Sequence, residues 1–501
     1  MFVCGAGFLL LIVWLVLDFR LGRKQHLSTL RPFYSPSVTS DFQLFSHGKE
    51  LIGDYFATLR RAETEIDIMF YIVRNDQLGQ EFFSILKEKA LEGVHVQLLL
   101  DRLGSLGIKK RIIADLRQAG VQVAFSNPVR PPFLFYSAQA RNHRKISVID
   151  GKIGYLGGFN IGLEYIDQGP AKLTPWRDYH VKMTGEGVAY LLAAFHNDWQ
   201  KRAANAAVLT EVQQDEIAAK VQVGLGAESS RPMKQQPNSG DLRAVLHQLV
   251  SGNLRAVLHQ PESGRLRAVR RQPDSAKLQT VRHQPDSAKL QTIRRQPDSA
   301  KLQTVQRQPS YYHNGDAYPS NQGAVRHQLM ATEGNQLERQ FIGLIRMAEQ
   351  EIIIGTPYFI PSQRILNELL AAARLGVKLV VIVPFTADHP LVQEASYRYL
   401  RELLQAGAQV FQYNHGFYHA KTIVIDDKVC DIGTANFDKR SLYLNKEMNC
   451  YFYSKEFITQ LKDVLQQDIH NSIPLKLTAL NTLNPYRTLK EILARALSYF
   501  L

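Results

Sequence analysis

Short apolar runs alternate with amphipathic segments along most of the chain. Residues 66–73 (IDIMFYIV) are almost continuously apolar, as in a strand buried on both faces, and residues 94–100 (VHVQLLL) form a second such run. Between them, residues 78–92 have the apolar spacing of a helix. This alternation of strands and helices predicts an α/β fold with a largely parallel sheet.

The same pattern returns in the last third of the chain. The tract QAGVQV at 118–123 reappears as QAGAQV at 405–410, each preceded by a helical pattern and a buried strand. We therefore predict two related α/β halves, at about 45–205 and 325–472.

The N-terminus is an uncharged apolar run, MFVCGAGFLLLIVWLVL, over residues 1–17. Seventeen residues is near the lower limit for a membrane-spanning helix. Arg20, Arg23 and Lys24 follow the run, and such basic flanks mark the cytoplasmic side. We predict a transmembrane anchor with its basic flank over 1–24 and the catalytic part in the cytoplasm. A cleaved signal peptide is the alternative, but it would need a basic start and a small-residue cleavage site.

A repetitive segment separates the two halves. Its units of 12 residues, such as PDSAKLQTVRHQ, run from 237 to 308. Each unit has few apolar residues and a regularly placed proline, so it can build neither a core nor a long helix. We expect 206–324 to be a linker containing disordered repeats over 237–308.

The net charge of +14 favours an anionic partner, which would be either nucleic acid or acidic lipid. The repeats hold 13 Lys and Arg against five Asp and Glu, so they carry more than half of this excess. We therefore expect no nucleic-acid partner. Three cysteines without a CxxC pattern predict neither a disulfide framework nor a zinc site.

Three other segments have weaker patterns. Residues 25–45 are predicted to be a connector behind the anchor. The aromatic tract RPPFLFY at 130–136 suits a loop that dips into a bilayer, or one that packs under the sheet. Residues 473–501 form an amphipathic tail, which suits an interfacial helix or one that docks on the protein body.

Each half contains the pattern H-x-K-x4-D, in HRKISVID and in HAKTIVID. The residues of the pattern are His143, Lys145 and Asp150 in the first half, and His419, Lys421 and Asp426 in the second. Small residues and asparagines follow at matching offsets: Gly158 and Asn160, then Thr434 and Asn436. A single histidine on a strand is usually structural, but two copies of the whole pattern indicate a site.

The spacing suits phosphodiester chemistry. On a strand, residues i and i+2 share a face, so the histidine and lysine of each motif are expected to project together. The lysine can neutralise a phosphate oxygen while the imidazole faces phosphorus. The small residues would let a phosphate approach closely, and the asparagines would donate hydrogen bonds. No metal is required by this arrangement.

The aspartates do not fit the same face. Asp150 lies seven residues after His143, an odd number, and precedes a turn-forming glycine. We expect Asp150 and Asp426 to fix turns, and other carboxylates to orient the imidazoles. The candidates are Asp178 in WRDYH, Glu447 in LNKEMN, and Glu164.

The paired motifs resemble those of the phospholipase D superfamily. The stretches RNHRKISVIDGKIGYLGGFNIG (141–162) and GTANFDKRSLYLNKEMN (433–449) are similar to bacterial cardiolipin synthases in particular. The resemblance covers about 25–205 and 325–501 and excludes the repeats. It implies two phospholipase D-like domains, each with a mixed sheet flanked by helices, in a pseudo-two-fold arrangement with both motifs in one cleft.

The resemblance also implies a mechanism. One histidine attacks the phosphodiester to form a phosphohistidine, and the other protonates the leaving alcohol and activates the incoming one. By analogy His143 is the nucleophile and His419 the acid and base, although the sequence alone does not separate these roles. Asp150 and Asp426 count as members of the catalytic motifs, and no cofactor is implied.

The implied reaction is cardiolipin synthesis at the cell membrane. One phosphatidylglycerol loses glycerol, and a second takes the phosphatidyl group through its free hydroxyl. A hydrolase that releases phosphatidic acid is the first alternative, since water would replace the lipid alcohol. A membrane-tethered nuclease or nucleic-acid-binding module is the second. The sequence leaves the oligomeric state open.

Overall fold

The computed structural model describes four stretches of the chain: residues 2–30, 33–203, 321–481 and 484–500. Almost all of the predicted linker, including the repeats at 237–308, lies outside these described residues.

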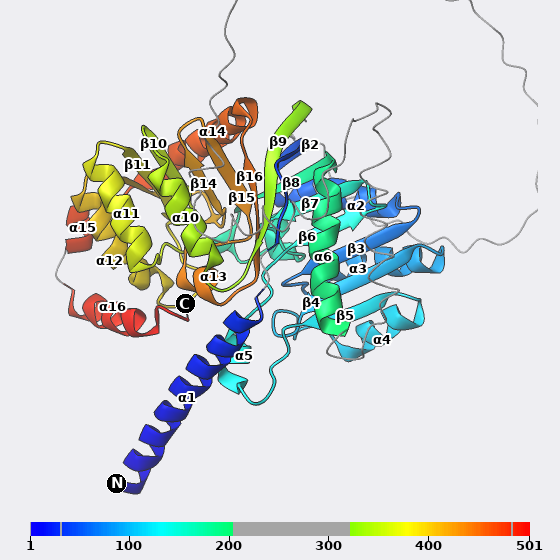
Figure 1. The fold of residues 1–501 in the computed structure, drawn as a ribbon, viewed down its shortest axis with the longest axis horizontal. Coiled ribbons are helices and arrows are strands. Elements are labelled where there is room, and N and C mark those ends of the chain that lie inside the picture. The colour runs from blue at the N-terminus through cyan, green and yellow to red at the C-terminus, as the bar shows by residue number, and fades with distance from the viewer. Residues whose placement is uncertain (1, 31–32, 204–320, 482–483, 501) are drawn as a thin grey trace, which may run out of the picture. The chain divides into compact units, whose positions relative to one another are not determined.

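The first half is a mixed sheet with helices on both faces (Figure 1). Its elements are α2 (Gly48–Arg60), β3 (Glu65–Phe70), α3 (Gln77–Leu91), β4 (His95–Asp101), α4 (Lys110–Gln118), β5 (Gln122–Ser126), α5 (Leu134–Gln139), β6 (Ile146–Ile149), β7 (Ile153–Gly157), the 3-10 turns η1 (Leu163–Ile166) and η2 (Ala171–Leu173), β8 (Trp176–Gly185) and α6 (Gly187–Ala203). The strand order is β5-β4-β3-β6-β7-β8, in which β3, β4 and β5 are parallel and the other pairs antiparallel.

The second half repeats this order as β12-β11-β10-β14-β15-β16, with the same parallel and antiparallel pairs. Its elements are β9 (Asn321–Thr332), α10 (Gln336–Arg346), β10 (Glu351–Gly355), α11 (Gln363–Arg374), β11 (Lys378–Pro384), α12 (Val392–Gln405), β12 (Gln409–Tyr413), β13 (Phe417–Tyr418), β14 (Thr422–Ile425), β15 (Val429–Gly433), α13 (Lys439–Tyr443), β16 (Glu447–Phe452), α14 (Lys455–His470), β17 (Ser472–Pro474), α15 (Leu477–Asn481) and α16 (Pro485–Leu497). These orders agree with the predicted repeat of related α/β halves. The prediction of a largely parallel sheet is wrong, because three of the five strand pairs in each half are antiparallel.

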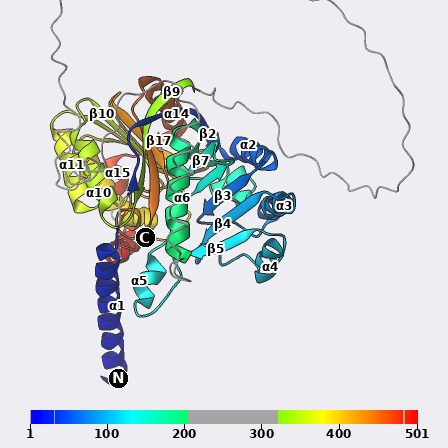
Figure 2. The same ribbon diagram turned by 45° about the vertical axis from the view of Figure 1, so that its right-hand side comes forward.

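Both faces of each central strand are buried, which explains their continuous apolar sequence. In β3, Ile66 and Ile68 pack with α2 and α3, whereas Met69 faces the cluster that contains α6. Figure 2 shows α6 crossing this face of the sheet. In β10, Ile352 and Ile353 divide in the same way between two clusters. Alternate side chains of a strand point to opposite faces, so a strand between two helical layers needs apolar residues throughout.

A seam of strands joins the two halves into one sheet. Strand β2 (Val38–His47) is antiparallel to β8 of the first half and to β9 of the second, and β9 in turn pairs with β16. A two-residue strand, β1 (Phe33–Tyr34), also pairs with β9. The prediction of a connector over residues 25–45 is therefore wrong. Phe42 and Leu44 are buried, and their alternation with polar residues marks a strand that the sequence reading overlooked.

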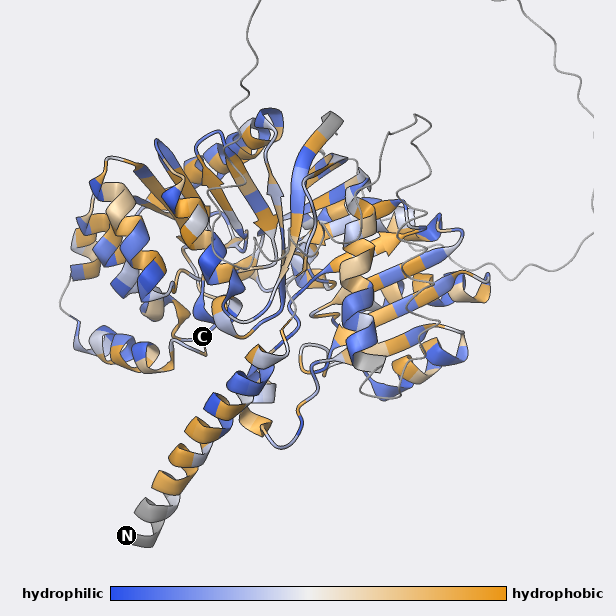
Figure 3. Cartoon of the chain, in the orientation of Figure 1, coloured by the Kyte–Doolittle hydropathy of each residue, from blue (hydrophilic) through white to orange (hydrophobic). Residues whose placement is uncertain are grey.

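The N-terminal helix α1 (Phe2–Ser28) contacts the first half through α5. The Asp18 carboxylate accepts a hydrogen bond of 2.7 Å from the backbone nitrogen of Tyr136, and the Phe19 ring packs against the Tyr136 ring. Apolar residues dominate its first part (Figure 3), and Leu9 and Leu10 are exposed. Within the described residues, no helix combines the length and apolarity that crossing a membrane requires.

Candidate active site

Each motif histidine is held in place by a strand of the opposite half. His143 and Lys145 lie in an extended segment just before β6, and His419 and Lys421 occupy the same position before β14. They therefore precede the strands, and the prediction that they lie within strands is wrong. The backbone nitrogen of His143 donates to the Lys446 carbonyl at 3.0 Å, and that of His419 donates to the carbonyl of Arg177 at 2.7 Å.

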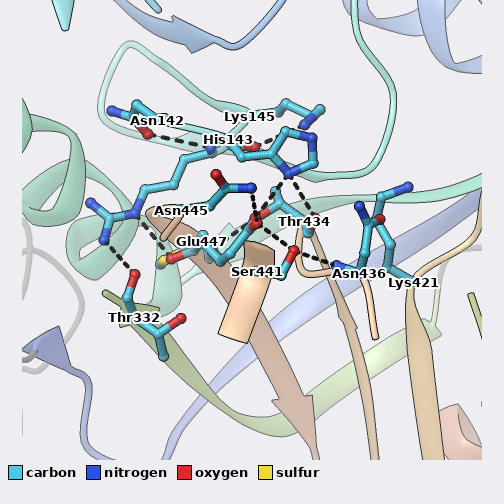
Figure 4. Close-up of polar contacts among 12 residues, drawn as sticks. Asn142, His143, Lys145, Thr332, Lys421, Thr434, Asn436, Ser441, Asn445 and Glu447 are labelled. Atoms are coloured by element: carbon cyan, nitrogen blue, oxygen red, sulfur yellow. Dashed lines mark hydrogen bonds and ion pairs between the residues drawn. The ribbon is translucent and has the colours of Figure 1, made fainter. Parts of the chain in front are cut away.

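This register places each imidazole beside a carboxylate from the other half. Glu447 follows Lys446, and its Oε2 lies 3.0 Å from Nδ1 of His143, which also contacts the Thr434 carbonyl at 3.0 Å (Figure 4). Asp178 follows Arg177, and its Oδ2 lies 2.7 Å from Nδ1 of His419. The partners of Nδ1 of His143 only accept hydrogen bonds, so this Nδ1 carries the proton and Nε2 is left with its lone pair. Nδ1 of His419 also lies 2.7 Å from Nζ of Lys421. The Asp178 carboxylate favours a proton on this Nδ1, whereas the ammonium favours its lone pair.

Both carboxylates are fully buried and fixed by further contacts. Glu447 accepts hydrogen bonds from three side chains, namely the hydroxyls of Thr434 (2.6 Å) and Ser441 (2.8 Å) and the amide of Asn445 (3.2 Å). Asp178 accepts from the backbone nitrogen of Tyr179 at 2.8 Å. A Cβ atom at Gly158 would lie 2.0 Å from Asp178, so this glycine makes room for the carboxylate. The prediction that Gly158 makes room for a phosphate is therefore wrong.

The charge states follow from burial and from the pairs. Burial lowers the pKa of His143, and it lowers that of His419 to about 4 with help from Lys421. For Asp178 and Glu447, burial alone would raise the pKa, but the neighbouring lysine and histidine outweigh it and the net shift is downward. At neutral pH the site thus holds two neutral imidazoles and two carboxylates.

The motif lysines are buried between these groups. The Lys145 ammonium donates to the His143 carbonyl at 2.8 Å, and Lys421 lies 3.3 Å from Oδ2 of Asp178. Burial lowers the pKa of Lys145 to about 7, a shift that Glu447 opposes and Lys421 reinforces. Lys421 disfavours the charged form of Lys145, and a bound anion would favour it. Among the residues that the structure describes, no group of His, Cys, Asp and Glu is placed to hold a metal ion.

The motif aspartates lie in turns and contact backbone instead of imidazole. Asp150 has a φ of 53° and accepts from the backbone nitrogens of Thr64 and Glu65 at 2.7 and 3.1 Å. Asp426 has a φ of 52° and accepts from the nitrogens of Gln350 and Glu351, both at 2.8 Å. These contacts agree with the turn-fixing role that the spacing predicts, and they place neither carboxylate at the reacting groups.

The remaining predicted residues have mixed positions. Oδ1 of Asn160 accepts from the backbone nitrogen of Ile72 at 3.1 Å, so this asparagine fixes the loop after β3. Asn436 is buried close to the site, and its Oδ1 has no hydrogen-bond partner among the described residues. Glu164, the third candidate carboxylate, pairs with Arg74 at 2.8 Å and orients no imidazole.

Aromatic rings that the sequence reading missed line the site. The Tyr71 ring lies 4.9 Å from the His143 ring, and the rings of Trp176 and Tyr358 lie 4.9 and 6.3 Å from that of His419. Tyr71 and Tyr358 follow the carboxyl ends of β3 and β10, where ligands bind in open α/β sheets. That rule would have found both tyrosines.

Arg144, between His143 and Lys145, points into a buried ion network that joins the halves. Its guanidinium lies 2.6 Å from Asp198 of the first half and 3.4 Å from Glu333 of the second. Lys446 of the second half also pairs with Asp198, at 3.1 Å. The network holds the backbone of the first motif against β16, where Glu447 begins the strand.

Comparisons with known proteins agree with this geometry. The family model described as the phospholipase D-like domain of cardiolipin synthase matches residues 55–168 and 341–469. The chain is 32% identical over 489 residues to the minor cardiolipin synthase ClsB of Bacillus subtilis, covering 97% of this chain and 96% of that protein. It is 30% identical to a cardiolipin synthase of Alkalihalophilus pseudofirmus, covering 92% of this chain and 72% of that one.

A solved structure shares the fold. The phosphatidylserine synthase of Haemophilus influenzae superimposes with a TM-score of 0.59, covering 96% of this chain and 99% of that one, at 14% sequence identity. At this identity the likeness concerns the fold alone. The sequence identity to curated relatives over nearly the whole length shows more: the chain belongs to the cardiolipin synthase family with phospholipase D-like domains.

Proposed function

We propose that this protein is a cardiolipin synthase that transfers a phosphatidyl group from one phosphatidylglycerol to another and releases glycerol. The observation that carries the proposal is the pair of buried neutral imidazoles, each with Nδ1 bound to a carboxylate of the opposite half. Two such groups can divide the roles of nucleophile and acid between them. The near full-length identity to curated cardiolipin synthases supports the choice of substrate.

The proposed reaction has two steps. In the first, Nε2 of His143 attacks phosphorus, the bond from phosphorus to the glycerol oxygen breaks, and His419 gives that oxygen a proton. In the second, His419 takes the proton from a hydroxyl of another phosphatidylglycerol, whose oxygen attacks phosphorus and breaks the bond to His143. The phosphate anion stabilises the protonated His419 before the first step, and Lys145 and Lys421 stabilise the added charge in both transition states.

Analysis of the products by mass spectrometry tests the proposal. The purified protein is incubated with phosphatidylglycerol in detergent, with and without EDTA. Cardiolipin and glycerol in equal amounts, formed at the same rate in both samples, are the expected result. Phosphatidic acid as the only lipid product would place the protein among hydrolases. Absence of lipid turnover would overturn the lipid substrate, and loss of activity in EDTA would overturn the metal-independent mechanism.

The membrane attachment is part of the same proposal. The exposed apolar residues of α1, among them Leu10 and Trp14, would insert into the membrane as the N-terminal anchor. The basic flank after them favours a cytoplasmic position of the catalytic halves. Helix α16 docks on α12, yet Leu489 and Ile492 remain exposed, which suits contact with the same surface. The predicted tail over 473–501 would then serve both to dock and to touch lipid.

The proposed role of Lys145 makes the reaction sensitive to alkaline pH. Because burial lowers the pKa of Lys145 to about 7, the free enzyme loses this positive charge as pH rises through neutrality. We expect kcat/KM for phosphatidylglycerol to fall on the alkaline side with an apparent pKa near that value. Lys145→Arg keeps the charge at all accessible pH values and should remove this limb, whatever its effect on the maximum rate. An unchanged limb in the variant would assign the titration to another group.

A further inference from the structure

A small pocket in the second half lies beside His419 and is not used by the steps above. It is formed where β10, β11 and β12 end, and helix α12 closes one side. Its wall is apolar at Val383, Pro384 and Leu400, and it contains Asp388 and Tyr358. The Tyr358 ring is the link to the catalytic centre, since it lies 6.3 Å from the His419 ring.

The Asp388 carboxylate is held in this pocket with one oxygen unused. The Tyr358 hydroxyl donates to Oδ2 of Asp388 at 2.5 Å, and the exposed His389 lies 3.5 Å from the same oxygen. The other oxygen, Oδ1, is buried and has no hydrogen-bond partner among the described residues. The whole side chain is only 12% exposed, so water has little access to it. Buried carboxylate oxygens are normally satisfied, so an unused one on a pocket-lining residue indicates a ligand that donates hydrogen bonds.

The negative charge of Asp388 also reaches the catalytic groups. Burial lowers the pKa of His419 and of Lys421, and Asp388 partly offsets the shift in both cases. Tyr358 bonds Asp388 and its ring lies 6.3 Å from the His419 ring, so a ligand on Asp388 would sit near the imidazole that handles the alcohol proton.

At the corresponding edge of the first half, the carboxylate is fully used. Asp101, at the end of β4, accepts hydrogen bonds from the Arg141 guanidinium at 3.2 Å and from the backbone nitrogens of Asn142 and Leu103 at 2.9 and 3.0 Å. It is saturated by the protein itself. The two halves thus share one fold but differ in these carboxylates, and the carboxylate with a free oxygen is in the second half.

We propose that Asp388, positioned by Tyr358, binds the glycerol headgroup of phosphatidylglycerol and selects it as the leaving and accepting alcohol. This inference rests on the proposed function and names the part of the site that sets its headgroup specificity. One glycerol hydroxyl exchanges its proton with His419, while the neighbouring hydroxyl donates to Oδ1 of Asp388. The carboxylate recognises the second hydroxyl of the diol, which a simple alcohol and water lack.

A competition between two acceptors tests the proposal. The full-length protein receives phosphatidylglycerol together with equal concentrations of deuterium-labelled glycerol and 1-propanol. Mass spectrometry then gives the ratio of labelled phosphatidylglycerol to phosphatidylpropanol. Both products arise from the same donor, so the ratio reports acceptor choice and is independent of the total rate.

The expected results differ between variants. Asp388→Asn should lower the ratio about tenfold, the size typical of losing a hydrogen bond to a charged group. Tyr358→Phe, which frees the carboxylate to move, should lower it several-fold and serves if the first variant is unstable. Ser396→Ala is the matched control: it lines the same pocket, but its hydroxyl donates to the Val392 carbonyl at 3.0 Å. Its ratio should stay within about twofold of wild type.

Three outcomes would count against the proposal. An unchanged ratio in Asp388→Asn and Tyr358→Phe would overturn it while leaving the proposed reaction intact. An equal drop in Ser396→Ala would show that any change in the pocket has this effect. Absence of both phosphatidyl alcohols with the wild-type protein would instead overturn the proposed function itself, and the headgroup site with it.

Discussion

His143→Ala and His419→Ala should each lower the rate of cardiolipin formation by about 10³-fold or more, because each removes one of two groups that act in sequence on the same phosphorus. The double variant should be no slower than the slower single variant, since residues that act as a unit are not additive. The measurement is initial rate by mass spectrometry, with the melting temperature as the check on folding.

A donor with an activated leaving group separates the two roles. A phosphatidyl ester of p-nitrophenol needs no proton on its leaving group, so His419→Ala should still release one equivalent of nitrophenol and accumulate phosphohistidine. His143→Ala should release none, because the attacking nitrogen is gone. The reverse pattern would make His419 the nucleophile. Equal residual turnover in both variants would contradict a covalent intermediate on either histidine.

Removing the negative charge from a partner carboxylate should have the second largest effect. Glu447→Gln and Asp178→Asn are each expected to lower kcat by about 10²- to 10⁴-fold, the range seen when the carboxylate behind a catalytic histidine is made neutral. Glu447 fixes the proton of His143 on Nδ1, and Asp178 favours the same tautomer of His419 against the nearby Lys421 ammonium. An amide in their place can present a donor to Nδ1 and favour the wrong tautomer.

The pairing across the halves gives this prediction a sharper form. With the activated donor, Asp178→Asn should behave like His419→Ala and keep the burst, whereas Glu447→Gln should lose it like His143→Ala. Glu164→Gln is the isosteric control, because Glu164 pairs with Arg74 outside the catalytic pairs, and its kcat should stay within about threefold. If Asp178→Asn abolished the burst and Glu447→Gln kept it, each carboxylate would serve the histidine of its own half.

The chain's local patterns are enough to identify the repeated fold and the residue types of the site. Buried strands such as 66–70 and 351–355 are recognisable because both faces pack against helices, which requires an almost continuous apolar sequence. The duplicated H-x-K-x4-D pattern is recognisable because it repeats with its surroundings. The odd offset of Asp150 from His143 likewise predicts that its carboxylate does not face the imidazole. In the structure Asp150 lies in a turn.

Local patterns fail where a segment's partners lie far away in sequence. Residues 38–47 resemble a connector because six of their ten side chains are polar, yet as β2 they form the seam between the two halves. Asp388 lies in a polar loop whose sequence shows no distinguishing pattern. Its unused oxygen is recognisable only in the tertiary structure, where α12 and Tyr358 enclose the side chain.

By itself, the sequence determined that this protein has two related α/β halves and two copies of a histidine and lysine motif, because both are encoded in short-range spacing. Only the tertiary structure decided that Glu447 serves His143 and Asp178 serves His419. Those pairs span 304 and 241 residues. The backbone bonds from His143 to Lys446 and from His419 to Arg177 set the register between halves, and side-chain spacing within one strand carries no information about that register.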